Sequence, residues 1–366
     1  MRLMKTPKKM ELLVTNRCNL RCRYCSYYSS PAEVDGDLST QEWLSFFEEL
    51  GRCAVMEITL EGGEAFLRKD LADLINGIVR NRMRFNILTN GTLITDEIAA
   101  YIAETGRCNL IQVSIDGSDG KTHDSCRGDG NFDRSIKGIQ CLLRHGVPVT
   151  VRVTIHRYNA DDLENVARLL LDDIGLSGFS TNSASFLGLC RDNADDIQLS
   201  VEQRSSVMDT LLRLDQAYPG RISAQAGPLA EAKTWVDMER ARKEGRPPMQ
   251  GRGYLKGCGG VFSKLGVRAD GMIVPCIQMG HILLGRMNED SLVEIWKDHP
   301  ELNRLRERMD IPLETFDECR ECPYIPYCTG NCPALSYTLT GEENRPSPDA
   351  CLRRFLSEGG RLPDVL

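Results

Sequence analysis

The chain lacks the features that mark membrane, secreted and nucleic-acid-binding proteins. Its apolar runs all fall far short of the roughly 18 residues needed to cross a bilayer. Residues 1–9 are basic, but no apolar core or cleavage site of a signal peptide follows them. No block of basic residues occurs, and the net charge of −7 argues against a nucleic-acid partner. Internal repeats and low-complexity segments are also missing. We therefore expect a cytoplasmic protein with no membrane and no nucleic acid among its partners.

Cysteine, by contrast, is abundant, with 15 residues in a chain of 366. A secreted disulfide scaffold would be shorter and carry a signal, whereas reducing compartments keep thiols free for metals. Ten of the cysteines fall into two spaced groups, one between residues 18 and 25 and one after residue 257. The other five are scattered, and we expect small buried residues at these positions: Cys53, Cys108, Cys126, Cys141 and Cys190.

The length and an ordinary globular composition, 41% hydrophobic and 27% charged, predict a barrel-sized unit plus a smaller one. Between residues 10 and 190, short apolar runs alternate with amphipathic stretches. The runs predict strands at Met10–Thr15, Val55–Leu60, Arg84–Thr89, Leu110–Ile115, Val147–Ile155 and Gly178–Phe186. The stretches predict helices at Thr40–Leu50, Asp70–Asn81, Asp96–Thr105, Phe132–His145 and Asp161–Asp173, the first capped by Ser39 or Thr40.

We interpret the predicted strands as apolar on both faces, which is typical of parallel strands covered by helices. Six β/α units in series favour an α/β fold, an open partial (β/α)6 parallel barrel rather than a closed eight-stranded one. In such folds the chemistry lies on the loops after the strands. Two further helices, Val201–Tyr218 and Leu229–Lys243, and a polar hinge predict a connector.

Cys18, Cys22 and Cys25 follow the first predicted strand with CxxxCxxC spacing. Three thiolates can bind three irons of a [4Fe–4S] cubane and leave the fourth iron for a small molecule, because such clusters normally take four thiolates. The alternatives are structural cysteines or zinc. Structural zinc prefers four ligands, and no fourth ligand lies close by in the sequence.

This loop resembles the signature loop of the radical S-adenosylmethionine (AdoMet) superfamily. The resemblance implies that AdoMet chelates the open iron and is cleaved reductively to a 5′-deoxyadenosyl radical. It extends to the run Glu61-Gly62-Gly63-Glu64-Ala65 after the second strand, where Ala65 replaces the family's proline. By itself, such a Gly-Gly run is usually a turn, and its place one β/α unit after the cysteine loop favours the functional interpretation.

The resemblance also implies which residues contact AdoMet. Gly62 and Gly63 would allow a close approach, and the Glu64 carboxylate suits the ammonium group. Ser114 and Asp116 would reach the ribose, while Arg127, in the run HDSCRG, would face the carboxylate. The remaining implied contacts are Asn90, backbone atoms near Ile155 for adenine, and the ring of Tyr24 beside it. Asn-Gly and Asp-Gly also form tight turns unaided, which is the alternative for Asn90 and Asp116.

The C-terminal cysteines resemble the seven-cysteine SPASM pattern, an auxiliary iron–sulfur module of radical AdoMet enzymes. The resemblance implies one complete auxiliary cluster on Cys319, Cys322, Cys328 and Cys351. It implies a second one on Cys258, Cys276 and Cys332, whose open iron could bind substrate, water or another residue, with Cys190 as a candidate. Together with the N-terminal site, three [4Fe–4S] clusters are expected. The expected domains are 1–200 (barrel), 201–253 (helical connector), 254–358 (SPASM domain) and 359–366 (tail).

The resemblance implies an enzyme whose radical abstracts hydrogen from its substrate. The leading expectation is a ribosomal-peptide maturase that forms a C–C or thioether crosslink. A small-molecule enzyme of tetrapyrrole or quinone-cofactor assembly is the alternative, as is a sulfatase-maturating enzyme that makes formylglycine. The last of these places an aspartate after the cysteine at position 276, where this chain has Ile277. An iron–sulfur electron carrier is the non-enzyme alternative.

Expected partners are a peptide or protein substrate and a flavodoxin- or ferredoxin-type electron donor. Only 17 residues precede Cys18, too few for a fused leader-binding domain of about 80 residues, which suggests a separate leader-peptide-binding protein.

Overall fold

The first six strands form a parallel sheet in the order of the sequence. The computed structural model describes residues 3–364, so residues 1–2 of the predicted barrel and 365–366 of the predicted tail lie outside it. The six strands are β1 (Lys9–Thr15), β2 (Glu57–Gly62), β3 (Arg84–Thr89), β4 (Cys108–Ser114), β5 (Val149–Ile155) and β6 (Phe179–Ser183). Each lies within a few residues of its predicted position, because alternating hydrophobic and β-branched residues favour strands there.

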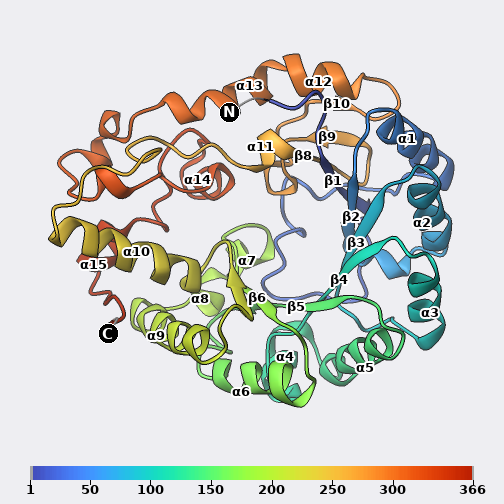
Figure 1. Ribbon diagram of the computed structural model, residues 1–366, viewed down its shortest axis with the longest axis horizontal. Coiled ribbons are helices and arrows are strands. Elements are labelled where there is room, and N and C mark those ends of the chain that lie inside the picture. The colour runs from blue at the N-terminus through green and yellow to red at the C-terminus, as the bar shows by residue number, and fades with distance from the viewer. Residues whose placement is uncertain (1–2, 365–366) are drawn as a thin grey trace.

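Helices cover the convex side of this curved sheet (Figure 1). They are α1 (Thr40–Arg52), α2 (Leu71–Arg80), α3 (Asp96–Glu104), α4 (Gly120–Arg127), α5 (Asn131–Arg144) and α6 (Leu163–Arg168), the last continued by a π-helical turn, Leu169–Asp173. The cap predicted for α1 is confirmed: Ser39 and Glu42 form a reciprocal capping box. The apolar face of α1, with Trp43 and Phe46, packs with Met10 and Leu12 of β1 in the main core.

The concave face of the sheet is polar, and here the expectation of strands apolar on both faces is wrong. In β5, Val149, Val151 and Val153 are buried toward the helices, while Arg152 and Thr154 alternate with them and line an internal cavity. A period-2 pattern of this kind indicates that only one face of the strand packs on the core. The other face is free to build a site.

The sheet extends beyond six strands at both edges. Beside β6 lies β7 (Ile222–Ala224), a parallel strand within the predicted helical connector. Beside β1 lies β8 (Lys264–Val267), also parallel, followed by the antiparallel strands β9 (Met272–Val274) and β10 (Gly285–Arg286). The order is β10-β9-β8-β1-β2-β3-β4-β5-β6-β7, an unclosed partial barrel with an additional C-terminal part.

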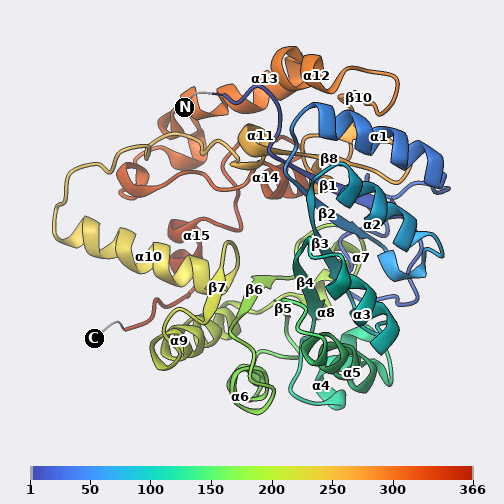
Figure 2. The ribbon, with the colours of Figure 1, turned by 45° about the vertical axis from the view of Figure 1, so that its right-hand side comes forward.

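The remaining helices lie mainly across the open side of the barrel. The connector forms α9 (Val201–Ala217) and α10 (Pro228–Lys243), and the segment after β6 forms α7 (Leu189–Asp192) and α8 (Ala194–Ile197). The C-terminal part adds α11 (Gly260–Ser263), α12 (Leu292–Asp298), α13 (Pro300–Glu307), α14 (Pro333–Thr340) and α15 (Leu352–Ser357). Figures 1 and 2 show this part between the β8–β10 edge and α10. None of the helices within residues 3–364 combines the length and the apolarity that a bilayer crossing requires.

Candidate active site and auxiliary cluster centres

The three N-terminal cysteines lie in the loop after β1 and line one cavity of about 380 Å³. The same cavity is lined by Ser114 at the end of β4 and by Arg152 of β5. The strands are parallel, so their C-terminal ends meet at the edge where the cysteine loop crosses. The structure therefore brings together the thiols and the polar concave face.

The thiols fit an iron–sulfur cluster by their chemistry. Burial raises the pKa of Cys22 to about 12; Arg127 opposes this, and the neighbouring thiols Cys25 and Cys18 add to it. The main-chain N–H of Leu20 donates to Cys18 Sγ at 3.4 Å. Cysteine ligates metals as thiolate, so a bound cluster would supply the positive charge that this buried site lacks. Within residues 3–364, no three His, Cys, Asp or Glu side chains converge on a single-ion site. The argument for a cluster therefore rests on three thiols, Cys18, Cys22 and Cys25, that are close enough to affect one another's pKa.

Two glycines at the C-terminal end of β2, Gly62 and Gly63, are required by the backbone of the cysteine loop. A Cβ on Gly63 would lie 2.2 Å from the carbonyl oxygen of Arg17, and one on Gly62 would lie 2.3 Å from that of Thr15. Gly62 also has a φ of +148°, which other residues rarely adopt. The sequence predicted a close approach to AdoMet at these glycines. The structure adds a close approach to the loop that holds the cysteines. Both glycines also line the cavity, and their contact with AdoMet stays a prediction.

The Glu64 carboxylate is buried and accepts hydrogen bonds from the segment that follows β2 and from the C-terminal end of β3. It is 1% exposed and accepts hydrogen bonds from Thr89 Oγ1 and Asn90 N, each at 2.8 Å, and from Phe66 N at 3.2 Å. Burial raises the pKa of Glu64, although these donors oppose the rise. Glu64 is not among the residues that line the cavity, whereas Asn90 is. The carboxylate therefore joins β2 to β3 and does not face the cavity where the sequence placed it.

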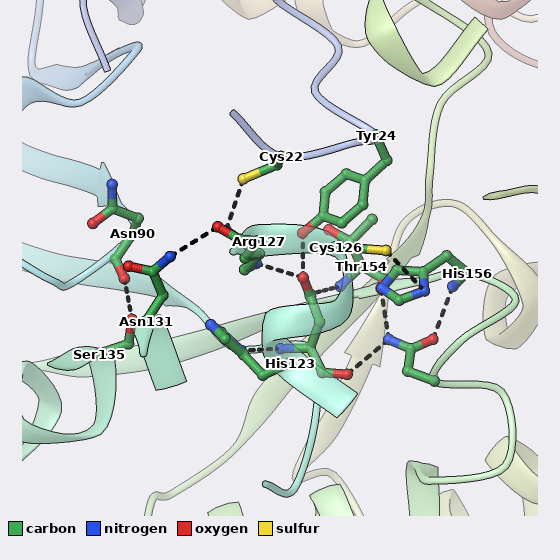
Figure 3. Close-up of polar contacts among 12 residues, drawn as sticks. Cys22, Tyr24, Asn90, His123, Cys126, Arg127, Asn131, Ser135, Thr154 and His156 are labelled. Atoms are coloured by element: carbon green, nitrogen blue, oxygen red, sulfur yellow. Dashed lines mark hydrogen bonds and ion pairs between the residues drawn. The ribbon is translucent and has the colours of Figure 1, made fainter. Parts of the chain in front are cut away.

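Asp116 and Arg127 form a buried ion pair, and Arg127 also lines the cavity of the cysteine loop. Arg127 Nε donates to Asp116 Oδ2 at 2.5 Å, the Tyr24 hydroxyl donates to the same oxygen, and Thr154 N donates to Oδ1 at 2.8 Å. Figure 3 shows Arg127 beside both Cys22 and Tyr24, with its Nη1 4.0 Å from Cys22 Sγ. Asp116 is fully buried and does not line the cavity. The expectation that it reaches the ribose is therefore not supported by its position.

Two buried histidines that the sequence analysis missed surround this pair. His123 Nδ1 accepts from the main-chain N–H of Asp116 at 3.1 Å, and His156 stacks on Tyr24 with ring centroids 5.3 Å apart. Burial lowers the pKa of each histidine to about 4, so both are neutral near pH 7. His123 lies in the run HDSCRG and could have been suspected there. His156 follows β5 with no motif to mark it.

Arg152 was also missed, although it is the basic side chain of β5 on the cavity wall. Its Nε donates to Ser180 Oγ at 2.7 Å, and burial lowers its pKa. The alternation Thr150, Arg152, Thr154 within a β-branched strand is the signal that could have revealed it.

Ile155 and Cys190 are both buried outside the lining of the cysteine-loop cavity. The carbonyl of Ile155 accepts from the N–H of Ala184 at 3.1 Å, its side chain is buried in the core, and it does not line the cavity. Cys190 is buried in a cluster with Tyr24 and Cys126, and Gln198 donates to its sulfur at 3.2 Å. The structure thus gives Cys190 the buried packing role and does not bring it to Cys258, Cys276 and Cys332.

The C-terminal cysteines form two coupled sets, as the sequence grouped them. Cys319, Cys322, Cys328 and Cys351 line one small cavity. Burial raises the pKa of Cys319 to about 12, with Cys328, Cys322 and Cys351 adding to the rise. The N–H of Gly330 donates to Cys328 Sγ at 3.5 Å. Four thiols around one cavity fit a fully ligated cubane.

The other set, Cys258, Cys276 and Cys332, lies beside the β8–β9 hairpin. Burial raises the pKa of Cys276 to about 12, with Glu11 and the Cys258 thiol acting in the same direction. Burial also raises the pKa of Cys332, the N-cap of α14, while N–H groups of the first helical turn oppose the rise. Main-chain N–H groups that point at a sulfur stabilise thiolate and cluster charge. Three thiols are coupled here, which fits a cluster with one open iron.

A second cavity of about 370 Å³ adjoins the first. The two cavities share Asn182, Ser183, Ala184, Ser185 and Gln278 as lining residues. The second cavity also touches Cys332 and Cys351, one cysteine from each auxiliary set. A molecule bound in the second cavity would adjoin the cysteine-loop cavity on one side. On the other side it would lie beside Cys332 and Cys351, one cysteine of each auxiliary set.

Family profiles agree with this arrangement. The profile of the radical SAM superfamily matches residues 12–170, and that of the SPASM iron-sulfur cluster-binding domain matches residues 258–323. The chain belongs to the radical SAM superfamily and carries a SPASM domain. AdoMet binding and iron–sulfur clusters come with this family.

Relatives of similar length carry names from tetrapyrrole metabolism. The AdoMet-dependent heme synthase of Methanosarcina barkeri is 27% identical over 341 residues, covering 92% of this chain and 94% of the relative. The pre-heme d1 synthase of Dinoroseobacter shibae is 27% identical over 370 residues, covering 98% and 90%. Among solved structures, Streptococcus suis SuiB bound to its precursor peptide SuiA has a TM-score of 0.72 at 15% identity, covering 95% of this chain and 76% of that one. Native anSMEcpe with bound AdoMet has a TM-score of 0.69 at 16% identity, covering 96% of each chain. The structures establish the shared fold.

Proposed function

We propose that this radical SAM/SPASM enzyme acts on a small molecule of haem-type tetrapyrrole assembly. The observation that carries the proposal is the similarity over nearly the whole length to two synthases of that chemistry. The leading expectation from the sequence was a peptide maturase, and the relatives favour its small-molecule alternative. The second cavity, of about 370 Å³, supports this, because its volume falls in the range of small-molecule sites.

The clusters and AdoMet, when bound, supply one electron and a 5′-deoxyadenosyl radical that abstracts a hydrogen atom from the substrate. The residues of the chain then have four tasks. Cys18, Cys22 and Cys25 hold the first cluster at the cavity wall, and Arg152 binds a carboxylate in that cavity. AdoMet carries such a group. Arg127 lines the same cavity, but its Nε is already paired with Asp116, so we assign the carboxylate to Arg152 rather than to the residue chosen from the sequence.

The shared wall of the two cavities, residues 182–185 and Gln278, positions the substrate next to AdoMet. The auxiliary cysteine sets on the far side would hold clusters that accept or relay an electron. A flavodoxin- or ferredoxin-type protein is the proposed electron donor.

The decisive test is turnover under anaerobic reducing conditions with AdoMet and a porphyrin that bears carboxylate side chains. We expect 5′-deoxyadenosine to form together with a porphyrin product of changed mass, both followed by liquid chromatography and mass spectrometry. A Cys18→Ala variant serves as the control and should form neither. If 5′-deoxyadenosine forms but every porphyrin stays unchanged, the tetrapyrrole assignment is wrong.

A peptide substrate is the second candidate, supported by the fold shared with SuiB and its bound precursor peptide. The same assay with short cysteine- or aromatic-containing peptides encoded near this chain tests it. A peptide that loses two hydrogens in step with 5′-deoxyadenosine formation would favour this candidate, and a separate leader-binding protein would then be expected.

A further inference from the structure

A wholly buried arginine lies next to the three-cysteine auxiliary set. Arg308 begins the short turn Arg308–Asp310 after α13 and is 0% exposed. Burying an unpaired guanidinium costs several kcal/mol unless its donors are satisfied and its charge is balanced. Neither the fold of the barrel nor the AdoMet cavity accounts for this residue.

The guanidinium of Arg308 ties three segments of the chain together. Nε donates to the carbonyl of Lys256 at 3.1 Å, and Nη2 donates to those of Asn331 at 3.2 Å and Arg345 at 3.0 Å. Nη1 donates to the carbonyl of Glu343. All four acceptors are main-chain oxygens. Lys256 lies two residues before Cys258, and Asn331 lies directly before Cys332. The guanidinium therefore holds the two loops that carry these cysteines.

These bonds satisfy the donors but do not neutralise the charge. Burial lowers the pKa of Arg308 to about 10, and the neighbouring thiols of Cys332 and Cys258, followed by Glu343, oppose the fall. The group is therefore still a cation near pH 7. Glu343 is itself engaged by His281 at 2.7 Å and by Arg304 at 3.1 Å. Iron-bound thiolates at Cys258 and Cys332 would therefore be the further anionic partners of the guanidinium.

We propose that Arg308 positions Cys258 and Cys332 and supplies the buried positive charge that stabilises the reduced state of the cluster held by Cys258, Cys276 and Cys332. This inference rests on the cluster assignment within the proposed function. Charge and hydrogen bonds around cluster sulfurs set the reduction potential, so the guanidinium makes this cluster easier to reduce.

The test uses full-length protein reconstituted with iron and sulfide, in a background with Cys18, Cys22 and Cys25 changed to Ala. That background isolates the auxiliary clusters and should bind about eight irons, two cubanes of four. Arg308→Gln and Arg308→Lys are compared by iron content and by redox titration with electron-paramagnetic detection. Cys276→Ala and Cys322→Ala assign the two signals. Arg221 is the matched control, because it also donates to main-chain carbonyls, those of Leu171, Leu176 and Ser177, far from the cysteines.

We expect Arg308→Gln to move the potential of the Cys258 cluster to more negative values, or to reduce iron to about four per chain by loss of that cluster alone. Arg308→Lys keeps the charge and should retain the potential better than Gln, with lower occupancy because one ammonium cannot bridge three segments. The electron-paramagnetic signal of the cluster that contains Cys322 should stay unchanged in both Arg308 variants. In Arg221→Gln the signals of both auxiliary clusters should stay unchanged. If Arg308→Gln fails to fold, Arg308→Lys decides: unchanged occupancy and potential there would overturn the proposal.

The cluster assignment fails in a different way. A background protein that binds clearly fewer than eight irons would show that one auxiliary set is not a cluster site. Eight irons in the background, with both potentials unaltered in Arg308→Gln, would refute the role of Arg308 alone.

Discussion

Arg127 Nε and Asp116 Oδ2 lie 2.5 Å apart inside the barrel wall, where both side chains are almost wholly buried. Although burial would raise it, Arg127 and the two nearby histidines hold the pKa of Asp116 below its usual range. The pair joins the end of β4 to the last turn of α4 and sits beneath Cys22. Arg127, which the sequence predicts as an AdoMet ligand, therefore also supports the cysteine loop, and its contact with AdoMet stays a prediction.

Removing one partner of this pair should destabilise the fold more than removing both. Arg127→Ala leaves Asp116 buried and unpaired, which typically costs about 3–5 kcal/mol. The double variant Arg127→Ala/Asp116→Asn should lose less, because no uncompensated charge remains. Urea unfolding of the four proteins of the cycle gives the coupling energy. Full stability in Arg127→Ala, combined with weaker AdoMet binding, would restore the ligand role.

Arg152 should matter for AdoMet affinity with little effect on stability. Arg152→Gln removes a charge-assisted pair with a carboxylate, worth roughly 1.5–3 kcal/mol, so the dissociation constant should rise about 10- to 150-fold. Isothermal titration of the reconstituted enzyme with AdoMet measures it. If the affinity for AdoMet is unchanged but the KM for the substrate rises, Arg152 binds a carboxylate of the substrate and not that of AdoMet.

Gly63→Ala should disrupt the N-terminal cluster selectively. Its Cβ would lie 2.2 Å from the Arg17 carbonyl oxygen and 2.4 Å from the adjoining carbon, so the loop must shift. We expect loss of about four of twelve irons, one cubane of three, and loss of AdoMet cleavage. Gly120→Ala is the control, since its Cβ would meet nothing closer than 3.6 Å. Normal iron content in Gly63→Ala would contradict the packing argument.

The cysteine triad should be separable from the auxiliary sets. Changing Cys18, Cys22 and Cys25 to Ala should abolish formation of 5′-deoxyadenosine yet retain about eight irons per chain. Iron analysis and chromatography of the reaction mixture measure both. Cleavage that persists in the triple variant would remove the cluster assignment of this loop.

Stability should fall as the pH drops from about 6.5 toward 4. His123 and His156 are neutral when folded because burial lowers each pKa to about 4, whereas the unfolded chain binds protons with a pKa near 6.5. The neutral histidines contribute their full stabilisation above pH 6.5, and this stabilisation is lost progressively as the pH falls toward 4. Between pH 7.5 and 5.5 the loss is about 1.3 kcal/mol per histidine. Urea unfolding at these two pH values tests this, with His123→Gln expected to halve the difference. An equal pH dependence in that variant would exclude His123.

The order of the strands and the grouping of the cysteines could be predicted from the sequence, because both depend on local patterns. Alternating apolar residues define β1 to β6, and the close spacing of Cys319, Cys322 and Cys328 places these three thiols around one cavity. The pairing of Asp116 with Arg127 could not be predicted, since two residues 11 positions apart can each face a ligand or face one another. Only the fold decides which.

Short edge strands were missed for a related reason. β7 is a three-residue strand, Ile222–Ala224, between two helices, and its hydrogen bonds to β6 rather than any residue pattern make it a strand. Likewise, nothing local in Met272–Val274 or Gly285–Arg286 reveals that they extend the barrel sheet beyond β8.

The pairing of β8 with β1 means that the two halves of the chain cannot be treated as interchangeable parts. A protein truncated before residue 264 would expose the hydrogen-bonding edge of β1, a strand at the centre of the full sheet. Open edges of this kind pair with other chains and promote aggregation. Swapping the C-terminal part between relatives to change the substrate would therefore succeed only if the junction lies after β10.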